Sequence, residues 1–145
     1  MMNRQLAYHE SGHACIRVAL GGEIHYASIC PSDPHVRPRT VLAERDEHAV
    51  ILAGIVSEFE FCPAEAKVGH YGGDDWERAA RWSQQERQIA AARAKELVAQ
   101  HRDAIQKVAQ ALLKSQHGLV LGERIARIVK GEQHSEATTN QGEVG

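Results

Sequence analysis

The chain has 145 residues, of which 43% are hydrophobic and 25% charged, and its formal net charge is −2 at pH 7. A length and composition of this kind predict one globular domain with a sizeable core, and the near-neutral charge gives no reason to expect nucleic acid or an anionic membrane as a partner. The longest apolar run, residues 49–56, is too short to cross a bilayer, and no signal-like segment precedes Asn3, so we expect a cytoplasmic protein.

The first expected element is a helix that begins after Asn3 and ends before Gly21. The Asn3 side chain can cap a helix, and the glycine pair 21–22 can end one. Its apolar positions surround most of the helix axis, and they are Leu6, Ala7, Ala14, Ile16, Val18 and Leu20. We therefore expect this helix to be mostly buried.

A small β-hairpin or edge sheet is expected next. Residues 23–30 alternate in a pattern compatible with a strand, and residues 31–38 are rich in turn-forming residues. Residues 39–44 are predicted to return as the partner strand.

The rest of the chain is predicted to be mainly helical. A second helix is expected from an acidic cap at Asp46 to Phe61, before Pro63, and residues 62–73 are expected to form a loop. Helices then run from Asp74 to about Gln116 with a break at 101–103, and a short helix follows Gly122. The second helix offers five residues to the core, Val50, Ile51, Ile55, Val56 and Phe59.

These elements together predict a mainly α fold, in the α+β class. Residues 1–130 are expected to form the domain. Residues 131–145 are almost entirely polar and small, and such a segment cannot bury enough surface to order itself. We therefore expect the last fifteen residues to be a flexible polar tail.

Residues 9–13, His-Glu-Ser-Gly-His, place two histidines four residues apart on the first expected helix. Residues at this spacing share a helix face, so His9 and His13 can both reach one ion, and neutral imidazole suits tetrahedral Zn²⁺. Glu10 lies about 100° around the axis, which suits a carboxylate that reaches a metal-bound water without binding the metal. Gly12 has no side chain and lets another backbone come close. The pattern therefore predicts a zinc site with a general base.

Four segments, in order, resemble the peptidase domain of the FtsH-type ATP-dependent zinc metalloproteases. "AYHESGHACIRVAL" is similar to the family's "HEAGHA" helix, although Ser11 stands where alanine is usual. "VILAGIVSEFEF" resembles the family's second helix, and "GGDDWERAARWS" resembles its "SNDLERAT" segment. "RAKELVAQHRDAIQKVAQALLKSQ" resembles the helices that follow. Order and spacing agree from about Leu6 to Val129.

The resemblance implies a zincin-like helical bundle in which Zn²⁺ is held by His9, His13 and Asp75, the last matching the aspartate of the family's Asn-Asp pair. It also implies hydrolysis of peptide bonds, with Glu10 as the base. The family joins this domain to a membrane anchor and an ATPase ring, and the chain contains neither a spanning segment nor a phosphate-binding loop. A separate ATPase partner and a homo-oligomer therefore remain open.

Four further residues are candidates for the site. Glu58 is a rival acidic ligand, but we interpret it as a residue that orients a ligand histidine. Asp74 follows two glycines and is expected to cap a helix, which leaves Asp75 facing inward. His70 and Tyr71 are candidate oxyanion donors, although loop residues of these types are usually plain surface groups.

Two classes of function fit this sequence. The first is a zinc-dependent metalloendopeptidase that hydrolyses flexible or unfolded polypeptides. The second is a non-catalytic interaction module that retains the peptidase fold. A proton-transfer glutamate at Glu10 has no purpose in a structural zinc site, which favours the enzyme. A dedicated peptidase for one regulatory partner shares the same chemistry and remains open.

Overall fold

The computed structural model describes residues 3–66 and 71–131. Within these residues the chain forms seven helices and a small three-stranded antiparallel sheet, which confirms the mainly helical α+β class. The elements, in chain order, are α1 (Arg4–Ala19), β1 (Ile24–Ser28), β2 (His35–Pro38), α2 (Glu44–Phe61), α3 (Pro63–Ala66), α4 (Gly73–Ala79), α5 (Gln84–Gln100), α6 (Arg102–Lys114), β3 (Leu119–Leu121) and a last helix over residues 122–131.

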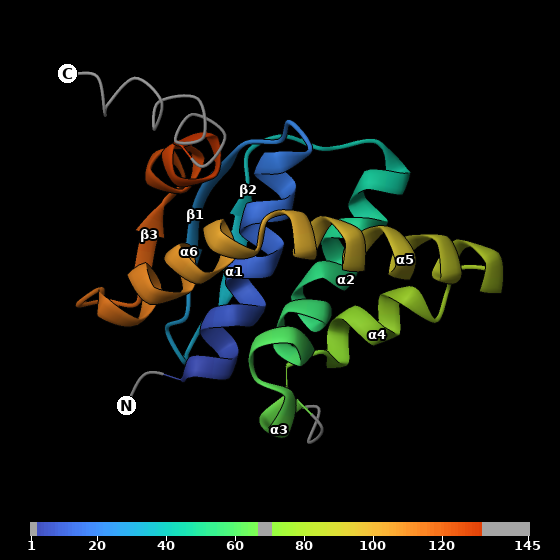
Figure 1. Cartoon of the computed structure of the whole chain (residues 1–145), viewed down its shortest axis with the longest axis horizontal. Coiled ribbons are helices and arrows are strands. Elements are labelled where there is room, and N and C mark those ends of the chain that lie inside the picture. The colour runs from blue at the N-terminus through green and yellow to red at the C-terminus, as the bar shows by residue number, and fades with distance from the viewer. Residues whose placement is uncertain (1–2, 67–70, 132–145) are drawn as a thin grey trace, which may run out of the picture.

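The helix α1 lies at the centre of the fold, between the sheet on one side and α2 on the other, with α5 and α6 running across them (Figure 1). It begins as expected at Asn3, whose side-chain oxygen accepts a hydrogen bond from the amide of Leu6 at 3.2 Å. Nearly every side of α1 is covered by other elements, so almost all of its residues are buried. The prediction of a buried first helix is confirmed.

Two glycines allow α1 and α2 to pack unusually close together. A Cβ on Gly12 would lie 2.6 Å from the carbonyl oxygen of Ala53, and a Cβ on Gly54 would lie 2.4 Å from Nε2 of His13. Real Cβ atoms do not come so near to other atoms. Glycine at these two positions therefore lets α2 lie directly against the histidine face of α1.

The sheet has the strand order β2-β1-β3, and both pairs are antiparallel. The predicted return strand at 39–44 is wrong, because the partner of β1 is β2, within the segment predicted to be turn-rich. Pro38 ends this edge strand, a place where the missing amide hydrogen costs no ladder bond. The strand β3 has only three residues, too few for an alternating pattern to reveal it.

Most of the predicted helix boundaries are close to the observed ones, with three corrections. The helix α2 begins at Glu44, two residues early, and its N-cap is Ala43, which has no capping side chain, so the acidic cap at Asp46 is wrong. The segment 62–73 contains α3, and its residues 67–70 lie outside the described part of the chain. The break between α5 and α6 at His101 is confirmed, but a further break at 80–83, where Ser83 caps the start of α5, was not predicted.

The predicted tail is tested only at its first residue. Gly131 belongs to the last helix, which covers 122–131, whereas residues 132–145 lie outside the described residues. Within the described residues, no helix is both long and apolar enough to cross a membrane.

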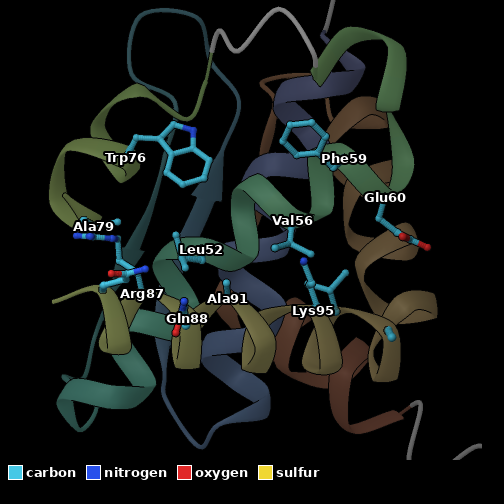
Figure 2. Close-up of a pocket in the computed structure, with 13 residues that line it drawn as sticks. Leu52, Val56, Phe59, Glu60, Trp76, Ala79, Arg87, Gln88, Ala91 and Lys95 are labelled. Atoms are coloured by element: carbon cyan, nitrogen blue, oxygen red, sulfur yellow. The ribbon is translucent and has the colours of Figure 1, made fainter. Parts of the chain in front are cut away.

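A large apolar groove of about 930 Å³ runs between α2, α4 and α5 (Figure 2). Phe59 and Trp76 stand at its rim and are 50% and 53% exposed. The expectation that Phe59 belongs to the core is therefore wrong, although Val50 and Ile55 on the same helix are buried as predicted. Phe59 lies near the end of α2, where its ring faces the groove.

Candidate metal centre

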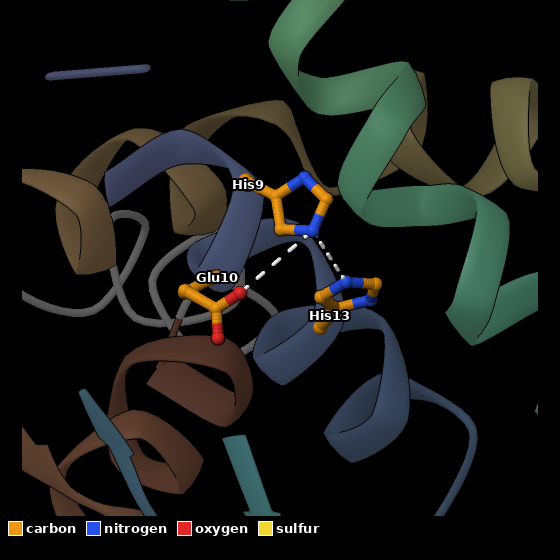
Figure 3. Close-up of side chains that lie close together, drawn as sticks. All are labelled: His9, Glu10 and His13. Carbon is orange, nitrogen blue, oxygen red and sulfur yellow. Dashed lines mark hydrogen bonds and ion pairs between the residues drawn. The ribbon is translucent and has the colours of Figure 1, made fainter. Parts of the chain in front are cut away.

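Three side chains from two distant segments meet beside the centre of α1. His9 and His13 lie one turn apart on α1, and Asp75 comes from the first turn of α4. Nε2 of His9 lies 2.9 Å from Nε2 of His13. Oδ2 of Asp75 lies 3.1 Å from the first of these nitrogens and 3.2 Å from the second. Figure 3 shows the two imidazole rings turned toward each other, with Glu10 beside them.

The spacing of these three atoms fits a tetrahedral zinc ion. Zinc ligands at roughly 2.0–2.2 Å from the metal lie about 3.3 Å apart in a tetrahedral site. The observed separations of 2.9 to 3.2 Å are slightly shorter than this, as expected for atoms that are hydrogen-bonded to one another. Two imidazoles and one carboxylate also leave the fourth position to another group, as catalytic zinc sites do.

The opposite nitrogen of each histidine ring faces an acceptor on α2. Nδ1 of His13 donates to the backbone oxygen of Val50 at 2.8 Å. Nδ1 of His9 lies 3.2 Å from Oε2 of Glu58, within ion-pair distance although not aligned as a hydrogen bond. Acceptors at Nδ1 place the hydrogen there and leave the lone pair of Nε2 for a metal. Glu58 thus lies behind His9, on the side of the ring away from Asp75.

One more residue of this arrangement, Gln5, was not predicted from the sequence. Gln5, on α1, donates its side-chain amide to Oε1 of Glu58 at 3.0 Å. It stands one helical turn before His9 and so shares its face, and this spacing was the available signal. A buried glutamine is not by itself informative without knowledge of what it faces.

Glu10 borders the same site from a neighbouring face of α1. Its Oε1 lies 3.7 Å from Nε2 of His9, and its Oε2 is buried without a hydrogen-bond partner among the described residues. Burial raises the pKa of Glu10 above its ordinary value, and Asp75 adds to this, while the two histidines oppose it. A carboxylate with a raised pKa and a free oxygen is suited to accept and return a proton.

The charges of the site favour a cation at its centre. Burial alone would lower the pKa of His9, but Asp75, Glu58 and Glu10 outweigh it and raise this pKa to about 9. Burial alone would likewise raise the pKa of Asp75, but hydrogen bonds with His13 and His9 hold it far below its ordinary value. A proton and a metal ion compete for the same ligand atoms in a site of this kind.

The site opens into a cleft of about 350 Å³ between α1, α4 and the edge strand β2. Tyr71 lines this cleft, and its hydroxyl accepts a hydrogen bond from the side chain of Asn3. His70, the other candidate oxyanion donor, lies outside the described residues. Asp74 is exposed in the first turn of α4, whose N-cap is Gly72, so its predicted role as the helix cap is wrong. The neighbouring Asp75 does face inward and is buried.

Comparison with known proteins adds no family assignment to this geometry. No protein-family model matches the chain, and no curated protein matches its sequence.

Proposed function

We propose that this protein is a zinc-dependent metalloendopeptidase with a zincin-like fold of the FtsH protease type. The observation that carries the proposal is the convergence of Nε2 of His9, Nε2 of His13 and Oδ2 of Asp75 within 3.2 Å of one another. Its support is the donor chemistry, since each histidine has an acceptor behind it and the third ligand is a buried carboxylate.

The residues around the ligands supply the rest of the reaction. Zn²⁺ in such a site supplies a water of lowered pKa and polarises the substrate carbonyl. Glu10 takes a proton from the attacking water at Oε2 and later gives it to the leaving amine nitrogen. The cleft beside β2 leaves room for a chain segment, and we expect flexible or unfolded polypeptides to be the substrates.

The test is hydrolysis of casein by the metal-reconstituted protein and by Glu10→Gln. The wild type should bind one zinc ion and cleave casein, and chelation should stop the cleavage. The variant should keep its zinc and its melting temperature but lose at least about 100-fold in turnover, the lower bound for removing a general base. It removes the base and none of the ligands.

Two outcomes would contradict the proposal. Near-normal turnover by Glu10→Gln would refute the assigned mechanism. Stoichiometric zinc without cleavage of casein or of any flexible peptide would favour the non-catalytic module, and a single cleaved partner would favour the dedicated peptidase.

A further inference from the structure

Gln5 and Glu58 form a buried chain of contacts that ends on a proposed zinc ligand. The amide of Gln5 donates to Oε1 of Glu58 at 3.0 Å, and Oε2 of the same carboxylate faces Nδ1 of His9 at 3.2 Å. Gln5 is 6% exposed and Glu58 is 3% exposed, so water does not replace either contact. Within the described part of the chain, Oε1 of Glu58 thus contacts Gln5 and Oε2 contacts His9, and these two residues lie one turn apart on α1.

A carboxylate in this position needs both contacts. Burial of a charged group is costly unless donors compensate for its lost hydration, and the amide of Gln5 is such a donor to Glu58. The amide also fixes the orientation of the carboxylate, because it occupies Oε1 and leaves Oε2 directed at His9. Without Gln5, the carboxylate is free to rotate, and this change would weaken its contact with His9.

We propose that Gln5 is a positioning residue of the metal centre, which acts through Glu58 to hold His9 with Nε2 directed at the metal. The inference rests on the proposed zinc site and adds a residue to it. Partners behind the ligands typically contribute 10–100-fold to metal affinity, and Gln5 stands one contact further away. We therefore expect an effect of about tenfold, at the lower end of that range.

The experiment measures zinc affinity of the full chain by competition with a chromophoric chelator. Gln5→Met keeps the length of the side chain and removes the donor, so it should weaken zinc binding about tenfold. Gln5→Asn keeps an amide but withdraws it from Glu58, and it should act in the same direction. Melting curves recorded without metal establish that each variant is folded.

A double-mutant cycle separates a positioning role from a merely structural one. Glu58→Gln should weaken zinc by about 10–100-fold, and Gln5→Met added to it should cause little further loss, because the carboxylate through which Gln5 acts is gone. A structural role would instead give two independent losses that add. Additive losses, or unchanged zinc affinity in both Gln5 variants, would overturn the inference.

Ser11→Ala is the matched control on the same helix. The Ser11 hydroxyl is fully buried and donates to the backbone oxygen of Ile105 at 2.6 Å, away from the metal centre. This variant should lower the melting temperature and leave the zinc affinity unchanged. Failure of the wild type to bind zinc would refute the proposed function itself, whereas normal wild-type binding with unaffected Gln5 variants would refute only the role of Gln5.

Discussion

Among the described residues, two groups of histidine and carboxylate side chains lie close enough together to be compared as metal sites, and their ligand atoms are arranged differently. The first is the proposed metal centre, where His9, His13 and Asp75 meet. The second, which we call the helix-end cluster, consists of Glu44, His48 and Glu86, whose ligand-type atoms lie within 4.8 Å of one another. Composition alone does not distinguish the two groups.

The carboxylates of the helix-end cluster have other roles. Glu86 completes a capping box with Ser83 at the start of α5, and Glu44 is 83% exposed in the first turn of α2. Carboxylates at helix N-termini are stabilised by the backbone amides there, whereas a cation would be repelled by two helix ends. His48 stacks on Trp82 with 3.8 Å between ring centroids, and its Nε2 is 3.9 Å from Glu44.

The proposed metal centre differs because its donor atoms point at one place. His9 and His13 each have an acceptor behind the ring, so their Nε2 atoms are directed together at Asp75. The comparison teaches that proximity of ligand types is a weak criterion. Convergence of donors on one place, with each histidine ring held by an acceptor behind it, is a stronger one.

The largest expected effect separates the two clusters directly. His9→Ala and His13→Ala should lose stoichiometric zinc, because two remaining protein ligands hold Zn²⁺ poorly. His48→Ala in the helix-end cluster should keep it. Metal analysis after dialysis measures all three variants, and full zinc content in either alanine variant of α1 would contradict the ligand assignment.

A smaller effect is expected at the third ligand, with its sequence neighbour as the control. Asp75→Asn replaces a carboxylate oxygen with a weaker neutral ligand and should reduce zinc affinity by more than about tenfold. Asp74→Asn should change it little, because Asp74 is exposed and contacts neither histidine at ion-pair distance. Equal losses in the two variants, measured by chelator competition, would argue against Asp75 as the ligand.

The smallest effect, counted per pH unit, is a dependence of zinc affinity on pH. The pKa of His9 is raised from 6.5 to about 9. Its protonated ring therefore adds to the free energy of unfolding in full below pH 6.5, and this contribution is lost as the pH rises through 9. Zinc requires the neutral ring, so affinity should rise about tenfold per pH unit between 7 and 9. Calorimetry in buffers of different ionisation enthalpy should detect release of the proton, and binding without proton release would contradict this account.

Local sequence patterns predicted much of the helical framework for clear physical reasons. Asn3 is a strong capping residue, Gly21 allows a positive φ of 92°, and α1 is apolar on most sides, so its bounds and burial could be read directly. The edge strand β2 could not be predicted in this way, because its place beside β1 is set by tertiary pairing and its proline suggested a turn. The exposure of Phe59 likewise depends on how far α5 covers α2.

The part of the candidate site that lies on one helix could be predicted from the spacing of its residues. His9, Glu10 and His13 follow from their spacing on one helix, whereas Asp75 was placed by the resemblance of its segment to a known family. Gln5 could not be recognised, because its contact with Glu58 joins residues 53 positions apart. Contacts of that range depend on how α1 and α2 pack at Gly12 and Gly54.

A crystal structure of the zinc-loaded protein, with anomalous scattering recorded at the zinc edge, would locate the metal directly. We expect one ordered zinc ion, bonded to Nε2 of His9, Nε2 of His13 and a carboxylate oxygen of Asp75, with Glu58 still behind His9. Zinc bound by Glu58 with Asp75 turned to solvent, or zinc at the helix-end cluster alone, would contradict it.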